Sequence, residues 1–325
     1  MASRSHRWRA ITDRLPELTY PLSATAASLW SLFAGPRHPV QGKEPLRPFF
    51  IIGSGRSGNT LVRRVLQAHS QLHIPPENHA LGTAITVYRR NRGLAWPHLV
   101  DLVLGTFQFS HGFDVFDVDL RPLAEELRAA PKENRSLAHV LDAFYRFHAR
   151  AHGQPCVYWG DKTPLNTFNA FKIGSVFPDV RFIHIVRDGV DVAESYVRAG
   201  LIADHDEAAR QWSSSIDAAR RAQQRYPEQF LEIRYEALVH EPEQVIRSVC
   251  EFLEISFESS MLSRTDHARD MGDVGHYAHH AQALEPISVD SVGKGRRELD
   301  PRTLETLAQV IGKQLHTLGY GPAVS

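Results

Sequence analysis

The loop Gly53-Ser54-Gly55-Arg56-Ser57-Gly58-Asn59-Thr60 follows an apolar strand candidate, Pro48–Ile52, and runs into a helical segment, Leu61–His69. A buried strand, a glycine-bounded loop and a helix in this order are typical of the phosphate-binding unit of α/β proteins. The glycines lie where the nucleotide-triphosphatase pattern G-x-x-x-x-G-K-[ST] has them, but Asn59 occupies the lysine position. The stretch therefore predicts a phosphate-binding loop that lacks its usual lysine.

The chemistry of this loop follows from its backbone. N–H groups that converge at the start of a helix attract anions, and Arg56 adds one fixed positive charge. The missing lysine is the group that would bridge the β- and γ-phosphates of a triphosphate. We expect the loop to hold a terminal oxyanion and not to hydrolyse ATP.

Composition narrows the class of protein. The chain has 325 residues, of which 42% are apolar, enough for one large α/β domain. Lys plus Arg equals Asp plus Glu at 37 each, so a general nucleic-acid surface is not expected. The two cysteines, Cys156 and Cys250, form neither a disulfide framework nor a zinc-binding spacing. These features favour a cytoplasmic enzyme that binds anions locally.

The first 47 residues are predicted to be a leader and linker, followed by one domain over residues 48–325. Arginines precede a mildly apolar stretch, residues 18–33, which is too polar for a membrane-spanning helix. This stretch is compatible with an interfacial helix that contacts lipid and with a loosely packed leader. The sequence leaves both alternatives open.

Strand and helix candidates alternate along the domain. This alternation predicts a P-loop-like three-layer α/β fold, with a central, mostly parallel sheet flanked by helices. A helical insert is expected over about residues 80–152, and an amphipathic helix from Leu304 to Leu318 should end at Gly319. The further strand candidates are Leu72–Ile74, Cys156–Trp159, Val180–Val186 and Phe230–Ile233.

Polar residues follow two of these strands, where an open α/β sheet places its ligand groups. Lys162 comes shortly after Trp159, and Arg187 directly follows Val186, with Ser195 two helical turns further on. A guanidinium and a nearby hydroxyl suit a second phosphate monoester. The alternative for Arg187 is a local ion pair with Asp188, which would itself cap the next helix.

Taken together, these motifs resemble the PAPS-dependent sulfotransferases, most closely the tyrosylprotein sulfotransferase branch with its bacterial relatives, over nearly the whole chain from Pro48 to Pro322. The family loop G-x-P-R-S-G-T-T-L is similar to residues 53–61, with Gly55 in place of proline and Asn59 in place of the first threonine. The resemblance implies that the loop binds the 5′-phosphosulfate of 3′-phosphoadenosine 5′-phosphosulfate (PAPS). It also implies that Arg187 and Ser195 hold the 3′-phosphate. The loop residues concerned are Gly55, Arg56, Ser57, Gly58, Asn59 and Thr60.

Two weaker stretches agree with this family. Tyr235 lies in a segment similar to R-Y-E-x-L, where the family tyrosine lies near the nucleotide, and Lys294 lies in a segment, residues 289–299, similar to the loop that closes over the cofactor. In residues 275–283 the chain departs from the relatives, because histidines replace an expected serine. The acceptor can differ accordingly. The histidines are His276, His279 and His280; their spacing could suggest a metal site, but the nearby glycines disfavour a regular helix, and we expect no metal.

Sulfuryl transfer requires charge stabilisation on the leaving nucleotide and a base for the acceptor. Lys162 and Arg56 are the predicted stabilising cations, assisted by Ser57, Thr60 and the backbone N–H groups of the loop. Glu77 is the predicted general base, since it falls where the tyrosylprotein relatives have their catalytic glutamate and follows apolar residues that can desolvate it. His79 is the rival base, and a charge complementing the next helix dipole is the structural alternative for Glu77.

We therefore predict a sulfotransferase that moves sulfuryl from PAPS to a hydroxyl or phenol. The alternatives are a P-loop nucleotide kinase and a non-enzymatic nucleotide-binding scaffold. The sequence leaves open the identity of the acceptor and whether the chain forms a homodimer. Four phenylalanines of the insert could line an acceptor pocket or form its core: Phe107, Phe109, Phe113 and Phe116.

Overall fold

The computed structural model describes residues 37–263 and 287–323. Within these ranges no helix is long and apolar enough to cross a membrane. The N-terminal segment for which lipid contact was considered and the group His276, His279 and His280 lie outside the described residues.

A five-stranded, all-parallel sheet forms the centre of the molecule, with strand order β2-β3-β1-β4-β5. This arrangement confirms the predicted α/β class. In the register, Ile51 pairs with Lys162 of β3 on one side and with Ile183 of β4 on the other. The strands are β1 (Phe49–Ile52), β2 (Leu72–His73), β3 (Tyr158–Lys162), β4 (Arg181–Val186) and β5 (Phe230–Arg234).

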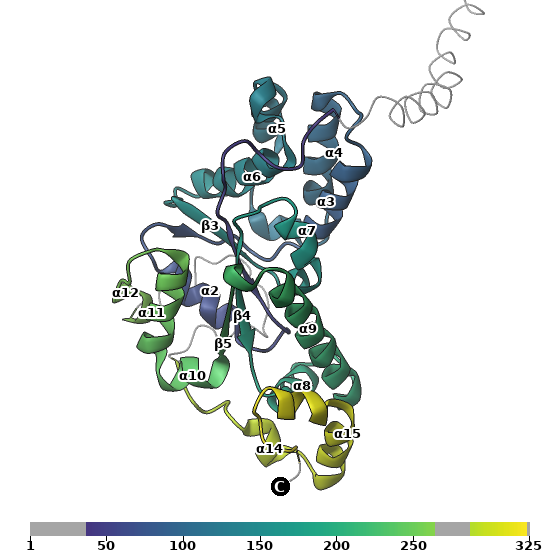
Figure 1. Cartoon of the computed structure of the whole chain (residues 1–325), viewed down its shortest axis with the longest axis vertical. Helices are drawn as coiled ribbons and strands as arrows, with labels where there is room; N and C mark the ends of the chain where they lie inside the picture. Colours follow the sequence, from purple (N-terminus) through teal and green to yellow (C-terminus); the bar gives the residue numbers. More distant parts are fainter. Residues whose placement is uncertain (1–36, 264–286, 324–325) are drawn as a thin grey trace, which may run out of the picture.

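Helices cover both faces of this sheet (Figure 1). The first half of the chain supplies α2 (Asn59–Gln67), α3 (Leu81–Arg90), α4 (Trp96–Gln108), α5 (Arg121–Arg128), α6 (Leu137–Ala151) and α7 (Ala170–Gly174). The second half supplies α8 (Gly189–Arg198), α9 (His205–Arg225), α10 (Tyr235–His240), α11 (Pro242–Leu253), α12 (Ser260–Ser263), α14 (Lys294–Glu298) and α15 (Pro301–Thr317). Short 3₁₀ helices are η1 (Phe113–Phe116), η2 (Lys132–Asn134), η3 (Pro164–Asn169) and η4 (Pro227–Gln229).

Strand β1 shows why there are three layers. Successive side chains of a strand point to opposite faces of the sheet. Phe50 and Ile52 belong to a core shared with α3, α4 and α6, whereas Phe49 and Ile51 belong to a second core shared with α2, α10 and α11. An internal strand buried on both faces reads as a continuous apolar run, as this one does.

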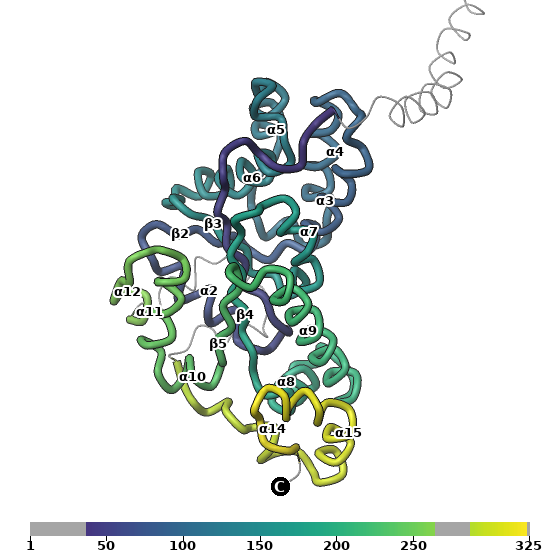
Figure 2. Tube along the Cα trace, viewed as in Figure 1, coloured from purple at the N-terminus to yellow at the C-terminus, as the bar shows by residue number. Residues whose placement is uncertain are grey.

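The C-terminal helix α15 packs against α8 and α9, although it lies far from them in sequence (Figure 2). Its apolar face buries Leu307, Ile311 and Leu315, and Gly319 follows it with a left-handed φ of 73°. The predicted amphipathic helix and its glycine end are confirmed.

The third strand differs from the prediction. Cys156–Trp159 was expected, but β3 runs from Tyr158 to Lys162, so Lys162 is its last residue and not part of the loop beyond it. Gly160 makes this possible, because a Cβ there would lie 2.3 Å from the ring of Phe49 in the neighbouring strand. The polar run Gly-Asp-Lys forms a strand because its pairing partner supplies the apolar packing.

Three of the four insert phenylalanines belong to the core and do not form a pocket, and the fourth is exposed. Phe107, Phe113 and Phe116 are buried around Phe144, while Phe109 is 89% exposed. Their apolar rings stabilise α4, η1 and α6 against one another.

Candidate active site

The glycine loop lies at the carboxyl edge of the sheet, between β1 and α2. Gly58 has a φ of 103°, and a Cβ at this position would lie 2.6 Å from the ring of Tyr235. Gly53 is equally restricted, because its Cβ would lie 2.5 Å from the carbonyl oxygen of Ile185. The loop therefore requires glycine at both positions, where the backbone adopts a conformation that L-residues avoid and passes close to β4 and α10.

Asn59 has a structural role at the position of the missing lysine. It is buried as the first residue of α2, and its side-chain amide donates a hydrogen bond of 2.7 Å to the carbonyl oxygen of Ser54. This bond closes the loop on itself. The Oγ of Ser57 is also buried and has no hydrogen-bond partner among the described residues. A buried hydroxyl of this kind fits a loop that receives an oxyanion.

Lys162 and Glu77 meet at the end of β3. The Nζ of Lys162 forms an ion pair with the Glu77 carboxylate, 85 residues away in sequence, and lies 3.4 Å from the Oγ1 of Thr60. The Lys162 side chain is fully buried, and that of Glu77 is 20% exposed. The ammonium therefore lies between the first turn of α2 and a partly solvated carboxylate.

Strand order explains this meeting. Because β3 lies between β1 and β2, the last residue of β3 is flanked by the loop that follows β1 and by the segment that follows β2. Arg63 of α2 donates from Nε and Nη2 to the carbonyl oxygen of Ile74, at 3.2 and 3.1 Å. The amide N–H of Asn78 donates to Thr163 Oγ1 at 3.0 Å. These bonds hold the Glu77 segment against both α2 and the end of β3.

The alternatives for Glu77 find less support in the geometry. Helix α3 begins at Leu81 and has no acidic residue in its first turn, so Glu77 does not act as an N-terminal helix charge. His79, the rival base, has an exposed side chain.

The second predicted site adjoins the first. Arg56 donates from Nε to Ser195 Oγ at 3.0 Å, and Arg187 donates from Nη1 to the carbonyl oxygen of Arg56 at 3.2 Å. Arg56 and Ser195 are 139 residues apart in sequence. Burial and the nearby Arg187 charge lower the pKa of Arg56. The pairing of β1 with β4 brings these groups together, since both follow neighbouring strands.

Arg187 is held on several sides. Its guanidinium lies 4.4 Å from the ring centroid of Tyr235, 3.6 Å from the Asp191 carboxylate, and donates to the carbonyl oxygen of Ser291 at 2.6 Å. Its Nε is buried without a hydrogen-bond partner in residues 37–263 and 287–323. The helix cap of the alternative interpretation is present, because Asp188 accepts the N–H of Val190 at 2.9 Å. The local ion pair, however, is formed with Asp191 and not with Asp188.

Asp191 is a site residue that the motif analysis missed. Its carboxylate accepts the amide N–H groups of Gly293 and Gly295, at 2.7 and 2.8 Å. It therefore fixes the C-terminal loop to α8. Burial raises the pKa of Asp191, and Arg187 and the two amides oppose that rise. The signal in the sequence was an aspartate four residues after Arg187, on the same helical face.

The contact described for Lys294 is within its own helix. Lys294 opens α14, and its Nζ lies 3.6 Å from Glu298 of the same helix. Among the described residues there is no group of three or more His, Cys, Asp or Glu side chains arranged for a metal ion.

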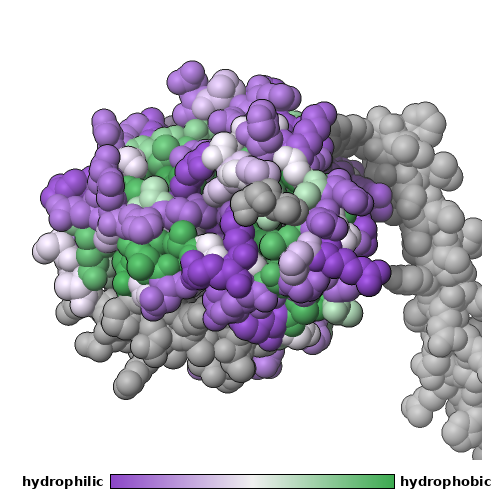
Figure 3. All heavy atoms as spheres, turned by 90° about the horizontal axis from the view of Figure 1, so that it is seen from below, coloured by the Kyte–Doolittle hydropathy of each residue, from purple (hydrophilic) through white to green (hydrophobic). Residues whose placement is uncertain are grey.

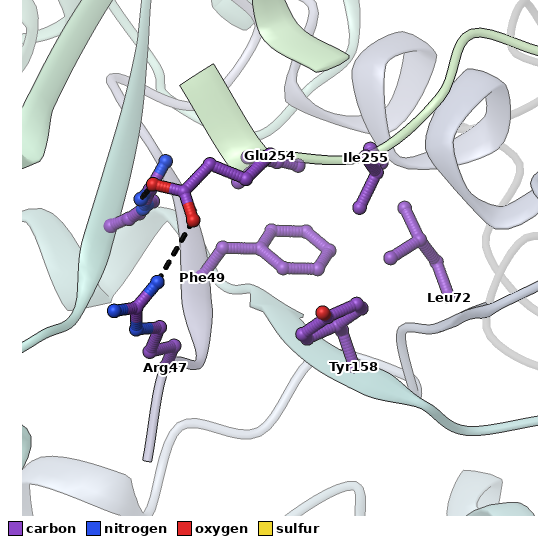
Figure 4. A pocket seen from close by; sticks show the side chains of 8 residues that line it. Arg47, Phe49, Leu72, Tyr158, Glu254 and Ile255 are labelled. Atoms are coloured by element: carbon purple, nitrogen blue, oxygen red, sulfur yellow. Dashed lines mark hydrogen bonds and ion pairs between the residues drawn. The ribbon is translucent and has the colours of Figure 1, made fainter. Parts of the chain in front are cut away.

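A small hollow lies at the opposite, amino-terminal edge of the sheet (Figure 4). Arg47 and Glu254 line this hollow and form an ion pair, in which Arg47 Nη1 lies 2.8 Å from Glu254 Oε2. Ligands of open parallel sheets bind beyond the carboxyl ends of the strands, so this hollow is separate from the candidate site. Its floor consists of the first residues of four strands: Phe49, Leu72, Tyr158 and Arg181.

Comparison with known proteins agrees with this geometry. A sequence profile described as "Sulfotransferase family" matches residues 48–259. Similar curated proteins include Protein-tyrosine sulfotransferase 1 of Danio rerio, 24% identical over 282 residues, covering 84% of this chain and 72% of that protein. Protein-tyrosine sulfotransferase 2 of Gallus gallus is 23% identical over 283 residues, covering 84% and 69%.

Two solved structures share the fold. The sulfotransferase domain from the curacin biosynthetic pathway has a TM-score of 0.53 at 24% identity, covering 86% of this chain and 99% of that domain. The sulfotransferase domain from the Synechococcus PCC 7002 olefin synthase has a TM-score of 0.54 at 22% identity, covering 87% and 98%. The resemblance inferred from the motifs is confirmed.

Proposed function

The chain belongs to the sulfotransferase family and is a sulfotransferase enzyme, and we propose that it transfers the sulfuryl group of PAPS to a hydroxyl or phenol. One observation carries this proposal. The buried ammonium of Lys162 contacts both Thr60, at the phosphate-binding end of α2, and the Glu77 carboxylate. A cation in this position can stabilise a leaving phosphate on one side while a base activates the acceptor on the other.

Binding of the donor uses the two adjoining anion sites. The loop N–H groups, Ser57 and Thr60 hold the 5′-phosphosulfate, and Arg187 and Ser195 hold the 3′-phosphate. Arg56 connects these sites, since its side chain bonds Ser195 while its backbone belongs to the loop. Ser57 Oγ and Arg187 Nε have no hydrogen-bond partner within the described part of the chain. They support the fit, because both are buried polar atoms that an oxyanion would satisfy.

In the proposed transfer, side chains of the protein accept the proton and stabilise the charge, and no metal is needed. Glu77 accepts the proton of the acceptor hydroxyl as the acceptor oxygen forms its bond to sulfur. The bond between sulfur and the bridging phosphate oxygen breaks, and its electron pair remains on adenosine 3′,5′-bisphosphate. Lys162 and Arg56 stabilise the negative charge on that oxygen. Since the transition state is loose, positioning and electrostatics supply most of the rate enhancement.

The acceptor enters on the side of Glu77. Leu165 and Phe168 of η3 follow Lys162 closely and are each 44% exposed. Residues three apart lie on the same face of a 3₁₀ helix, so the two side chains form one apolar surface. They support an acceptor that carries an apolar group next to its hydroxyl. Mass spectrometry of extracts from cells with and without the gene tests this, through products that differ by one SO₃ unit; exclusively polar products would contradict it.

Nucleotide selectivity separates the sulfotransferase from a nucleotide kinase. Thermal unfolding is measured with adenosine 3′,5′-bisphosphate, ATP and ADP in turn. We expect the bisphosphate to stabilise the protein by about 2.7 kcal/mol at roughly 100 times its Kd, with smaller effects of ATP and ADP. Stabilisation by ATP but not by the bisphosphate would refute the proposal, because it would indicate a triphosphate site.

Group transfer separates the enzyme from a nucleotide-binding scaffold. Transfer of ³⁵S from labelled PAPS is followed in a cell lysate with the wild-type protein, Glu77→Gln and Lys162→Ala. Each variant should lower transfer about a hundredfold or more while the folded state persists by circular dichroism. Matched controls are Glu133→Gln and Lys132→Ala, whose side chains are exposed in η2. Equal transfer by site and control variants would contradict the assigned roles.

A further inference from the structure

A ring of polar contacts joins the end of the chain to the start of α8. On one side, Arg296 of α14 donates from Nε to Asp188 Oδ2 at 2.7 Å. The same guanidinium donates from Nη2 to the carbonyl oxygen of Gly321 at 2.9 Å, and it also bonds the carbonyl of Pro322. Arg296 therefore connects the cap of α8 to the segment that follows α15.

Glu236 forms the other side of the ring. Its Oε1 accepts the backbone N–H of Asp188, and its Oε2 accepts the hydroxyl of Tyr320, both at 2.9 Å. Burial and the Glu236 carboxylate raise the pKa of Tyr320, so the phenol keeps the proton that it donates. Tyr320 directly precedes Gly321, which Arg296 contacts, so the contacts of Arg296 and those of Glu236 form a closed ring. We call the residues Asp188, Glu236, Arg296 and Tyr320 the C-terminal clasp.

The clasp lies beside the group proposed to hold the 3′-phosphate. Arg187 directly precedes Asp188, and Asp191 follows one turn later in contact with Arg187. Figure 1 shows α14 and α15 next to α8, and hydrophilic residues alternate with hydrophobic patches on the face seen from below (Figure 3). Two carboxylates next to a phosphate site would repel a dianion unless each is compensated. Asp191 is compensated by Arg187 and two backbone amides, and Asp188 by Arg296.

We propose that Arg296 is a positioning residue for the 3′-phosphate of the nucleotide, which it serves by neutralising Asp188 and holding the start of α8 in place. This inference rests on the proposed function, in which Arg187 and Ser195 bind that phosphate. Removal of Arg296 leaves a largely buried carboxylate next to the 3′-phosphate. The loop that holds the 5′-phosphate keeps the hydrogen bond from Asn59 to the carbonyl oxygen of Ser54, which closes it on itself.

The test compares two nucleotides that differ by the 3′-phosphate. Isothermal titration measures adenosine 3′,5′-bisphosphate and adenosine 5′-phosphate against the wild type, Arg296→Ala and Arg296→Lys at one ionic strength. We expect Arg296→Ala to weaken binding of the bisphosphate about tenfold, which is the effect of losing one charge-assisted hydrogen bond. Binding of adenosine 5′-phosphate should weaken less than about twofold. Lysine should restore part of the loss, because it returns the charge without the planar fork.

Two further variants keep the test decisive. Arg302→Ala is the matched control, since this arginine is exposed at the start of α15. Tyr320→Phe removes one hydroxyl and retains the ring, so it tests the clasp should Arg296→Ala fail to fold; we expect about a threefold loss for the bisphosphate alone.

The outcomes distinguish the two levels of the argument. The positioning role would be overturned if a clasp variant lost the same affinity for both nucleotides, or if no clasp variant lost affinity for the bisphosphate. The proposed function would stand in either case. A wild-type protein that binds no bisphosphate would refute the proposed function itself.

Discussion

Acid should destabilise this protein through a buried pair of histidines. His73 ends β2, just before the segment that carries Glu77, and its Nε2 lies 2.9 Å from the Nδ1 of His148 on α6. Both side chains are buried, and the ring of His152 lies 4.4 Å from that of His148. Burial first, then nearby positive groups including Arg63, lower the pKa of His73 from 6.5 to about 3 and that of His148 to about 2.

The sign and size of the effect follow from these values. Below pH 6.5 the unfolded chain binds protons at both histidines, whereas the folded chain does not bind them until about pH 3. Stability is therefore present above the unfolded pKa and is lost as the pH falls. At pH 5, which is about 1.5 units below the pKa of an unfolded histidine, protonation of the unfolded state lowers the free energy of unfolding by about 2 kcal/mol per histidine. The two sites together should lower the free energy of unfolding by about 4 kcal/mol between pH 7 and pH 5, a large part of an ordinary domain's stability.

Urea unfolding followed by tryptophan fluorescence measures this change at pH 5, 6 and 7. The comparison protein carries His73→Gln and His148→Asn, whose amides retain polar groups near the bonded ring nitrogens but do not titrate. We expect the double variant to lose about 4 kcal/mol less than the wild type over this range, whatever its stability at pH 7. If both proteins lost the same free energy, the other histidines would account for the pH dependence and the reasoning from this pair would be wrong.

Three further predictions concern the site. Gly58→Ala should lower the free energy of unfolding by about 1–3 kcal/mol in thermal denaturation, because alanine is strained at φ 103° and would contact Tyr235; Gly105→Ala, in open space within α4, should raise it by about 0.5–1 kcal/mol. A Gly58→Ala protein as stable as the wild type would contradict the strain argument. Asn59→Asp replaces a donor by a negative charge in the phosphate loop, and should weaken adenosine 3′,5′-bisphosphate about tenfold in titration calorimetry; unchanged affinity would show that the amide has no part in shaping the loop. Lys162→Ala should lower kcat about a hundredfold with a much smaller change in KM for PAPS, and an effect confined to KM would assign Lys162 to binding instead of charge stabilisation.

Local sequence was enough to predict the class of fold. The run from Pro48 to Leu61 contains its own strand, its glycine turn and its helix start, and each is encoded by neighbouring residues. The apolar run at Val180–Val186 and the periodic leucines of α15 are equally local, and the structure confirms them. Strand β3 was placed wrongly because Gly160, Asp161 and Lys162 are polar or small, and become a strand only by pairing with β1.

Less of the candidate site than of the fold could be predicted from the sequence. Its individual residues could be named from the ends of strands and from the family resemblance, but Asn59 could not be explained without the carbonyl of Ser54 opposite it. Asp191 and Arg296 were missed, because an aspartate within a helix and an arginine in the short C-terminal helix α14 match no motif. Each also has a partner more than a hundred residues away, which is Gly293 for Asp191 and Asp188 for Arg296.

The sequence by itself determined the parallel α/β architecture and the glycine loop between β1 and α2, because periodicity, glycine placement and helix caps act between near neighbours along the chain. Only the tertiary structure decided which of the polar strand ends meet. The order β2-β3-β1-β4-β5 places Lys162 between Thr60 and Glu77, and brings Arg56 to Ser195. That order depends on packing between segments 85 and 139 residues apart, which no local pattern specifies.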